Sequence, residues 1–465
     1  MSNTKHSPSN TRQNSRKMYS SIWTVLATVA LSAALVFNPA DQPLLSSVGF
    51  SLIAYLVTYN LIPALGPAFI KVGFSGRDLS KKDRPEIPET MGAVCAIVYL
   101  FCMFLFIPFV FYQYLAKTIG GGVHLGYDSL SEGLVKGRIL SSFPHEKLAE
   151  YLSAILCLQS MFILGVADDL FDIRWRNKFF LPAIAAIPLL IVYYVDFGIT
   201  AVMVPVVLRP YFGDIVDLGA LYYGYMAAVA IFCPNSINIY AGVNGLEVGQ
   251  SVMIGVCILL NDFIYLVQPN HPAEESHLFS VYLLLPFLAV SIALLRHNWC
   301  PARCFVGDTY CYFAGMVFAV VGILGHFSKT LLLFFVPQIF NFLYSVPQLF
   351  KIVDCPRHRL PKFNPETGLL EPSRAYFDKK KPGKLGRIMI YVLEKLHLLK
   401  VWRDEKGEVT SISNMTLINL VLVYIGPLQE DHLAAVLLGI QFVSGLAAIA
   451  LRHSVAAMIF GRDNI

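Results

Sequence analysis

The chain has 465 residues and a formal net charge of +5, and 56% of its residues are hydrophobic while only 14% are charged. A soluble protein of this length would carry about a quarter charged residues. The composition therefore excludes an ordinary set of soluble domains and indicates a chain that crosses a membrane several times.

Apolar runs long enough to cross a membrane recur from end to end. About 20 apolar residues span the hydrocarbon core as a helix, and backbone groups in lipid must be satisfied within the run, so helices are expected rather than strands. The candidate spans are 20–37, 48–70, 91–115, 148–167, 179–197, 219–237, 246–267, 278–295, 308–325, 330–350 and 431–451. We predict an all-α polytopic membrane protein with about ten core helices and one extra N-terminal hydrophobic helix.

The chain divides into three predicted parts. Residues 1–43 form a basic tail and an anchor helix, because the run 20–37 follows four basic residues but "NPADQP" offers no clear cleavage site for a signal peptide. Residues 44–452 form the transmembrane domain, and 453–465 a C-terminal tail. The short apolar run 412–425 ends in Gly-Pro and is not counted as a span.

Five polar loops fall on one face of the predicted bundle, because successive helices alternate in direction. They are 71–90, 168–178, 238–245, 296–307 and 351–413. The short loops of this face carry more Lys and Arg than the opposite loops, so the positive-inside rule places the face in the cytosol.

Small elements are expected within two of the longer loops. On the opposite face, 198–218 reads as a small hairpin, while "FNPETGLLEP" inside 351–413 reads as a turn between short strands. Residues 386–400 have helical apolar spacing with basic ends, which fits either a helix in the membrane interface or one packed on the core of the loop. The loop 351–413 is therefore predicted as a cytosolic subdomain of mixed strand and helix.

Three acids stand where the fourth apolar run stops, in "ADDLFDIRWRNK". Asp168 and Asp172 are four residues apart and share a helix face, with Asp169 about 100° round. Carboxylates this close repel unless a cation lies among them, and either Mg²⁺ or the nearby Arg and Lys would serve. A charged membrane border is the alternative, but it does not explain why the acids cluster on the basic face.

The other loops of this face add complementary groups. "CPNSINIYAGVNGLEVGQ" combines Asn, a neutral oxygen ligand, with glycines that permit close backbone approach to a ligand. Asp308 heads a span near Phe305, and Arg357, His358 and Arg359 lie between prolines, where guanidinium groups suit phosphate oxygens. Helix capping and contact with anionic lipid are the simpler readings of these two loops. Taken together, the loops suit magnesium and a phosphorylated ligand at the bilayer boundary.

The strings "DDLFD", "NSINIYAGVNGLE" and "VGDTYCYFAGM" resemble motifs of the polyprenyl-phosphate N-acetylhexosamine-1-phosphate transferase family, and "CPRHRLP" resembles its eukaryotic branch. The resemblance spans about 48–452. It implies transfer of GlcNAc-1-phosphate from UDP-GlcNAc to dolichyl phosphate, giving GlcNAc-diphosphodolichol and UMP, as the first committed step of lipid-linked oligosaccharide synthesis for protein N-glycosylation. It also implies the endoplasmic reticulum membrane, a site facing the cytosol, dependence on Mg²⁺ and sensitivity to tunicamycin.

The resemblance also implies roles for individual residues. Asn238 and Asp308 match the family's metal ligands, Asp168 and Asp169 its essential acidic pair, and Lys178 a phosphate contact. Arg357 matches a pyrophosphate contact, His358 and Arg359 match contacts to the N-acetyl sugar, and Glu89, Gly242, Asn244 and Phe305 match the uridine side. Position 172 is Asp or Asn in the family, which leaves a metal role for Asp172 open.

Two other classes and one other mechanism remain open at this stage. A transporter would carry polar groups along a path from both faces, and an aromatic prenyltransferase would need a second Asp-rich cluster beside the lone Asp308. Direct attack by the acceptor phosphate is expected, with Asp168 as a covalent nucleophile the alternative. Membrane lipid is an expected partner and nucleic acid is not, while the oligomeric state is open, a homodimer included.

Overall fold

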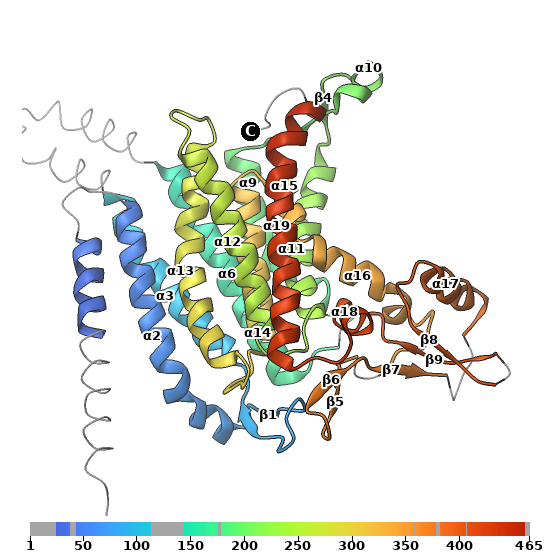
Figure 1. The fold of residues 1–465 in the computed structure, drawn as a ribbon. Coiled ribbons are helices and arrows are strands. Elements are labelled where there is room, and N and C mark those ends of the chain that lie inside the picture. The colour runs from blue at the N-terminus through green and yellow to red at the C-terminus, as the bar shows by residue number, and fades with distance from the viewer. Residues whose placement is uncertain are drawn as a thin grey trace, which may run out of the picture.

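The computed structural model describes residues 25–37, 43–112, 144–174, 178–356, 359–377, 382–405 and 407–460. Within them a helical bundle carries a small strand-rich subdomain on one side (Figure 1). The bundle helices are α2 (Pro43–Val72), α3 (Gly92–Val110), α6 (His145–Phe171), α8 (Leu181–Ala185), α9 (Ile187–Asp196), α11 (Ala220–Ile239), α12 (Leu246–Leu266), α13 (Glu274–Asn298), α14 (Gly307–Leu324), α15 (Ser328–Phe334), α16 (Val336–Leu349), α18 (Leu417–Ile425) and α19 (Glu430–Phe460). The predicted all-α polytopic fold is confirmed.

The number of spans depends on how broken helices are counted. Among the described residues, seven helices are long and apolar enough to cross a membrane singly, and α15 with α16 make an eighth if the pair, bent by 71°, counts as one span. The breaks follow proline: Pro188 and Pro337 lack an N–H and clash with the carbonyl four residues back, which separates α8 from α9 and α15 from α16. Part of the predicted N-terminal span appears as the short apolar helix Val25–Val36.

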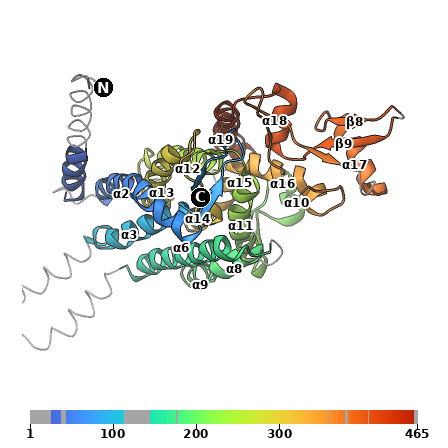
Figure 2. The ribbon, with the colours of Figure 1, turned by 90° about the horizontal axis from the view of Figure 1, so that it is seen from below.

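Helix α14 is the axis of the bundle. Every residue from Thr309 to Leu324 is buried, and α14 packs against α3, α6, α11 and α13 (Figure 2). Two glycines permit this approach: a Cβ at Gly165 of α6 would lie 2.7 Å from the Thr309 Cα, and one at Gly315 would lie 2.3 Å from the Pro234 Cα of α11. The first half of α14 therefore packs closely between α6 and α11.

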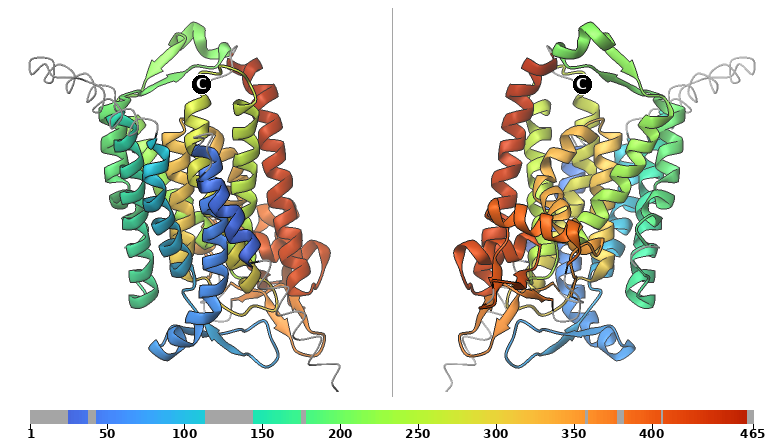
Figure 3. Two further views of the ribbon diagram at one scale, coloured as in Figure 1. Left: turned by 90° about the vertical axis from the view of Figure 1, so that its left-hand side faces the viewer. Right: turned by 90° about the vertical axis from the view of Figure 1, so that its right-hand side faces the viewer.

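Short antiparallel strands lie at both ends of the bundle (Figure 3). The predicted hairpin in 198–218 is confirmed as β3 (Ala201–Met203) paired with β4 (Ile215–Asp217), with a 3₁₀ turn (Val206–Leu208) and the short helix α10 (Arg209–Phe212) between them. At the other end, β1 (Ser75–Arg77) pairs with β2 (Glu86–Pro88). This second hairpin was not predicted, because its mixed charges give no strand periodicity.

The subdomain that follows α16 has the mixed structure expected of 351–413. The predicted turn is confirmed between β5 (Lys362–Asn364) and β6 (Leu369–Glu371). A three-stranded sheet in the order β7 (Arg374–Tyr376), β9 (Val409–Ser413), β8 (Val401–Arg403) packs with α17 (Lys384–Lys395) in a second hydrophobic core. The helix predicted over 386–400 therefore begins two residues earlier and ends at Lys395.

Candidate functional site

Asp169, in the last turn of α6, caps the first turn of α14. Its carboxylate accepts hydrogen bonds from the Asp308 N–H at 2.7 Å, the Thr309 N–H at 3.2 Å and the Thr309 hydroxyl at 2.6 Å. The N–H groups of a helix start have no partner within the helix, and a negative charge there is favourable. Asp169 is thus held by the N-terminal turn of α14, and it in turn fixes the position of Asp308.

Gly307, immediately before Asp308, is a position that only glycine fits. Its φ is +74°, and an added Cβ would lie 2.4 Å from Oδ2 of Asp169 and 2.8 Å from the Thr90 Cα. The close contact between α6, the start of α3 and the start of α14 depends on this missing side chain.

The Lys178 ammonium joins two of the acids. It donates to Asp168 Oδ2 and to Asp308 Oδ2, each at 2.7 Å. Burial alone would lower the pKa of Lys178, but Asp308 and Asp168 raise it above its ordinary value, so the ammonium stays charged. The side chain of Asn238, near the end of α11, lies beside the Asp308 carboxylate. Asp168 of α6, Asn238 of α11 and Asp308 of α14 therefore meet at one end of the bundle, together with Lys178, which is 130 positions from Asp308.

Glu89 adds a further acid from the loop before α3. Burial, followed by the nearby charges of Asp169 and Asp308, raises the pKa of Glu89 above its ordinary value. Its neighbour Thr90 is buried and has φ +63°, a conformation that a β-branched residue adopts at a cost of about 1–3 kcal/mol. We call Glu89, Asp168, Asp169 and Asp308 with Lys178 the acidic cluster; it carries four carboxylates around one ammonium.

Asp172 lies outside this cluster, contrary to the shared helix face predicted for it with Asp168. Helix α6 ends at Phe171, and Asp172 is its left-handed cap with φ +47° and an exposed side chain. Asp168 remains in the last turn, where Oδ1 accepts from the Ile173 N–H at 3.1 Å. The helical spacing argument was wrong because it assumed that the helix continues through residue 172.

The hairpin β1–β2 leads from the acidic cluster to Asn244. A Cβ at Gly76 would lie 2.9 Å from the Phe305 ring and 3.3 Å from Glu89 Oε2, so the two predicted uridine-side residues meet beside β1. Two residues along, Asp78 Oδ2 accepts from the Asn244 amide at 3.0 Å while Oδ1 accepts from the Ser80 N–H at 2.9 Å. A carboxylate only accepts, so Asp78 fixes which end of the Asn244 amide turns toward it.

Three residues that the sequence analysis did not single out hold this region together. Glu430, at the start of α19, accepts from the Asn244 N–H at 3.2 Å and forms an ion pair with Lys81, whose ammonium also lies 3.1 Å from Cys300 Sγ. Asp78 and Lys81 lie in a loop of mixed charge, and such a loop is ordinarily interpreted as exposed to solvent. No sequence pattern indicated a role for Glu430, because its partners are remote in the chain.

The long loop after α16 reaches the same region through Leu360. A Cβ at Gly242, where φ is +123°, would lie 2.3 Å from Leu360 Cδ2, which places the neighbour of Arg359 against the α11–α12 loop. Nη1 of Arg359 is buried and has no hydrogen-bond partner among the described residues, so its charge is available to a ligand. Arg357 and His358 lie outside the described residues.

The donor set suits a hard divalent cation better than a structural zinc. No group of three or more His, Cys, Asp or Glu with metal-site geometry occurs among the residues that the model describes. Asn238 and Asp308 offer two oxygen ligands in contact, beside a surplus of carboxylate charge. Mg²⁺ is typically bound by one or two protein carboxylates and completes its shell with water and phosphate oxygens.

A family model matches the part of the chain that carries most of these residues. The model of glycosyl transferase family 4 matches residues 151–326, which include the acidic pair, Asn238, Asn244 and Asp308. Together with the full-length relatives described next, this match makes the chain a membrane-bound enzyme of the class that transfers sugar phosphates.

The most informative relatives match almost end to end. The UDP-N-acetylglucosamine–dolichyl-phosphate N-acetylglucosaminephosphotransferase of Saccharomyces cerevisiae is 55% identical over 95% of this chain and 98% of its own length. The protein of the same name from Schizosaccharomyces pombe is 53% identical over 94% of this chain and 98% of its own length. The one from Dictyostelium discoideum is 41% identical over 87% of this chain and 88% of its own length. The chain belongs to this family of N-acetylglucosaminephosphotransferases.

Proposed function

We propose that this protein transfers GlcNAc-1-phosphate from UDP-GlcNAc to dolichyl phosphate, releasing UMP, in the endoplasmic reticulum membrane with its site facing the cytosol. The observation that carries the proposal is the acidic cluster: four carboxylates, one ammonium and the neighbouring Asn238 lie together at the membrane end of α6, α11 and α14. Full-length relatives bearing that activity in their names support the choice of substrates.

The position of the cluster suits reactants of unlike solubility. UDP-GlcNAc is charged and dissolves in water, whereas the tail of dolichyl phosphate stays in lipid. Because the cluster lies where spanning helices end, a phosphate held at the bilayer surface and a nucleotide from the aqueous side both reach it.

The proposed reaction mainly requires that the negative charges of the two phosphorylated substrates be neutralised. A phosphate monoester has a second pKa of about 6, so the acceptor is largely ionised near neutral pH and needs little help from a general base. The barrier is the approach of one anion to the phosphorus of another. Lys178, Arg359 with its buried Nη1, and the N-terminus of α14 supply positive potential for these groups.

Asn238 and Asp308 are the residues that would hold a magnesium ion. When bound, Mg²⁺ would neutralise charge on the diphosphate of UDP-GlcNAc and so favour UMP as the leaving group, with the other phosphate retained on GlcNAc. Asp168 is engaged at both oxygens, by Lys178 and by the Ile173 N–H, which favours a role in positioning the ammonium over one as a covalent nucleophile. Asp169, occupied by three donors from α14, orients Asp308.

The test is a transfer assay with the purified full-length protein in lipid. UMP should be released from UDP-GlcNAc only with dolichyl phosphate present, should stop on chelation of divalent ions, and should resume when Mg²⁺ is restored. Tunicamycin should block it. Absence of UMP release would contradict the proposal, and release from UDP-galactose but not UDP-GlcNAc would change its substrate.

A further inference from the structure

Helix α17 presents an apolar face that the subdomain does not cover. Gly386 and Ile390 are buried in the subdomain, and a Cβ at Gly386 would lie 2.7 Å from the Ile352 carbonyl oxygen. The side chains of Leu385, Ile388, Val392 and Leu396 lie between 45% and 61% exposed. Their spacing of three, four and four residues sets them along one face of the helix, turned away from the buried one.

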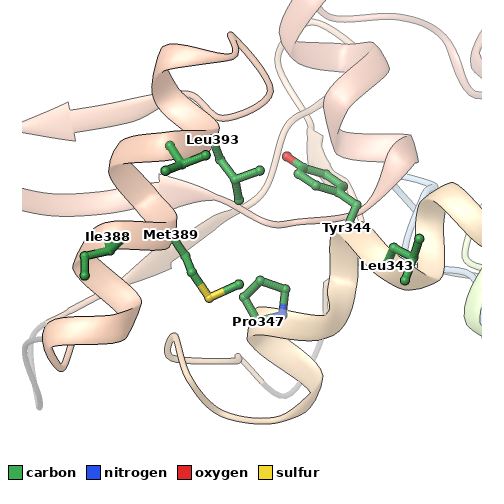
Figure 4. A pocket seen from close by; sticks show the side chains of 7 residues that line it. Leu343, Tyr344, Pro347, Ile388, Met389 and Leu393 are labelled. Carbon is green, nitrogen blue, oxygen red and sulfur yellow. The ribbon is translucent and has the colours of Figure 1, made fainter.

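The apolar surface continues from α17 onto α16. A cavity of about 200 Å³ lies between the two helices, and its lining includes Leu343, Tyr344 and Pro347 from α16 and Ile388, Met389 and Leu393 from α17 (Figure 4). Leu343 is itself 62% exposed. An open groove that joins two exposed apolar faces needs a non-aqueous neighbour.

The position of the two helices identifies that neighbour. Because of the 71° bend after α15, α16 leaves the bundle sideways, and Figure 1 shows α17 beyond its far end, at about the same height and above the strands β7–β9. The spanning helices require a bilayer around the bundle. The groove therefore opens at the level of lipid, while the strands lie on the side of the acidic cluster.

The charges along α17 fit an anionic lipid surface. The helix carries Lys384, Arg387 and Lys395 but a single acid, Glu394, which is paired with Arg403. Tyr391, 60% exposed, has the amphipathic ring favoured where lipid meets water. An amphipathic helix with basic flanks lies in the membrane interface and is attracted by anionic headgroups.

We propose that the apolar face of α17, together with the adjoining side of α16, is inserted in the lipid leaflet on the site's side of the membrane, with its lysines on anionic headgroups. Acyl chains of that leaflet fill the groove. The contact anchors the subdomain, and with it Arg359, beside the bilayer. It rests on the membrane-spanning fold and not on the proposed reaction, so the two can fail separately.

The test measures which solutes reach α17 in the full-length protein reconstituted in vesicles. A nitroxide is attached to Ile388→Cys or Val392→Cys, with Arg387→Cys and Glu394→Cys on the polar face as matched controls, and the unsubstituted protein gives the background of native thiols. The labels at 388 and 392 should collide with oxygen and be shielded from a water-soluble nickel chelate, and the controls should show the reverse. Free access of the chelate to 388 and 392 would overturn the proposal, as would shielding from both solutes, which indicates cover by a second copy or another protein.

The headgroup part is tested by charge reversal. In vesicles containing phosphatidylserine, Lys395→Glu should weaken the contact, since each Lys near an anionic surface contributes about fivefold in partition. The chelate should then reach position 392 more readily, whereas Lys362→Glu in β5 should leave it shielded, and neither change should matter in phosphatidylcholine alone. Equal effects of the two variants would remove the role of anionic headgroups.

Discussion

Two clusters of buried polar groups lie at opposite ends of the bundle, and they are built differently. In the distal cluster, Asp262 of α12 is fully buried, and its two oxygens accept from His277 Nδ1 at 2.7 Å and Ser280 Oγ at 2.5 Å. The His277 ring is stacked between Tyr265 at 4.1 Å and Phe327 at 5.2 Å. The one carboxylate of the distal cluster therefore has a hydrogen-bond donor for each oxygen and is enclosed by aromatic rings.

The acidic cluster at the other end has more carboxylates than cations and is partly open. Of its four carboxylates, those of Asp168 and Asp308 are paired with the one ammonium, and the Asp308 side chain is 33% exposed. Strained backbone at Thr90 and the obligatory glycine at 307 lie in the same place. A closed, satisfied polar group indicates a structural role, whereas surplus charge, an opening and strain together indicate a ligand site. This contrast predicts different consequences for carboxylates at the two ends.

The largest expected effect is on turnover, from Asp308→Asn. The change removes charge where the diphosphate is neutralised but keeps the size of the side chain, so turnover should fall by about 10²–10³. The rate of UMP release under saturating substrate and Mg²⁺ measures it. Asp214→Asn, whose side chain is 80% exposed on the opposite hairpin, is the control and should retain the full rate. A normal rate for Asp308→Asn would show that the charge of Asp308 is not needed for the reaction, and the acidic cluster would then not be the catalytic site.

A smaller loss is expected from Gly307→Ala, which alters no charge. The added Cβ would meet Asp169 Oδ2 at 2.4 Å and push Asp308 from its position, and a displacement of about 1 Å costs about 10²-fold in rate. Gly213→Ala is a matched control, because Gly213 also has positive φ, +78°, but its added Cβ would meet nothing within 4 Å. If the two variants lost activity equally, backbone strain rather than the fit around Asp169 would be the cause.

The polytopic helical fold and the convergence of the loops were predictable from sequence, because long apolar runs have few alternatives in lipid. The number of spans was not, since the described residues hold seven candidate spans, or eight with the bent pair, against eleven predicted runs. The strings around Asp168, Asn238 and Asp308 indicated a site, and the structure brings these three residues to one place. The end of α6 was not predictable, since a left-handed cap at Asp172 follows from tertiary contacts and not from local spacing.

The distal cluster and the contacts of Asp78 and Glu430 with Asn244 were not predicted from the sequence, for a common reason. Glu430 lies 186 residues from Asn244 and 349 from Lys81, and Asp262 and His277 stood in runs that read only as the ends of spans. Pairs this remote form no pattern along one helix or loop. They become visible only when packing brings α19 beside the α11–α12 loop, and α12 beside α13.

The smallest expected change in turnover, and a clear loss of stability, come from Asp262→Ala in the distal cluster. His277 and Ser280 would each lose a buried acceptor, at a cost of about 1–3 kcal/mol per group. The midpoint of thermal unfolding in detergent should fall, while turnover per folded molecule, measured well below that midpoint, should stay within about twofold of the unaltered protein, since no ligand reaches this end. Asp214→Ala on the exposed hairpin should change neither quantity. A fall in turnover without a fall in the unfolding midpoint would mean that the distal cluster acts on the site through α12, and the division between a structural end and a chemical end of the bundle would then be wrong.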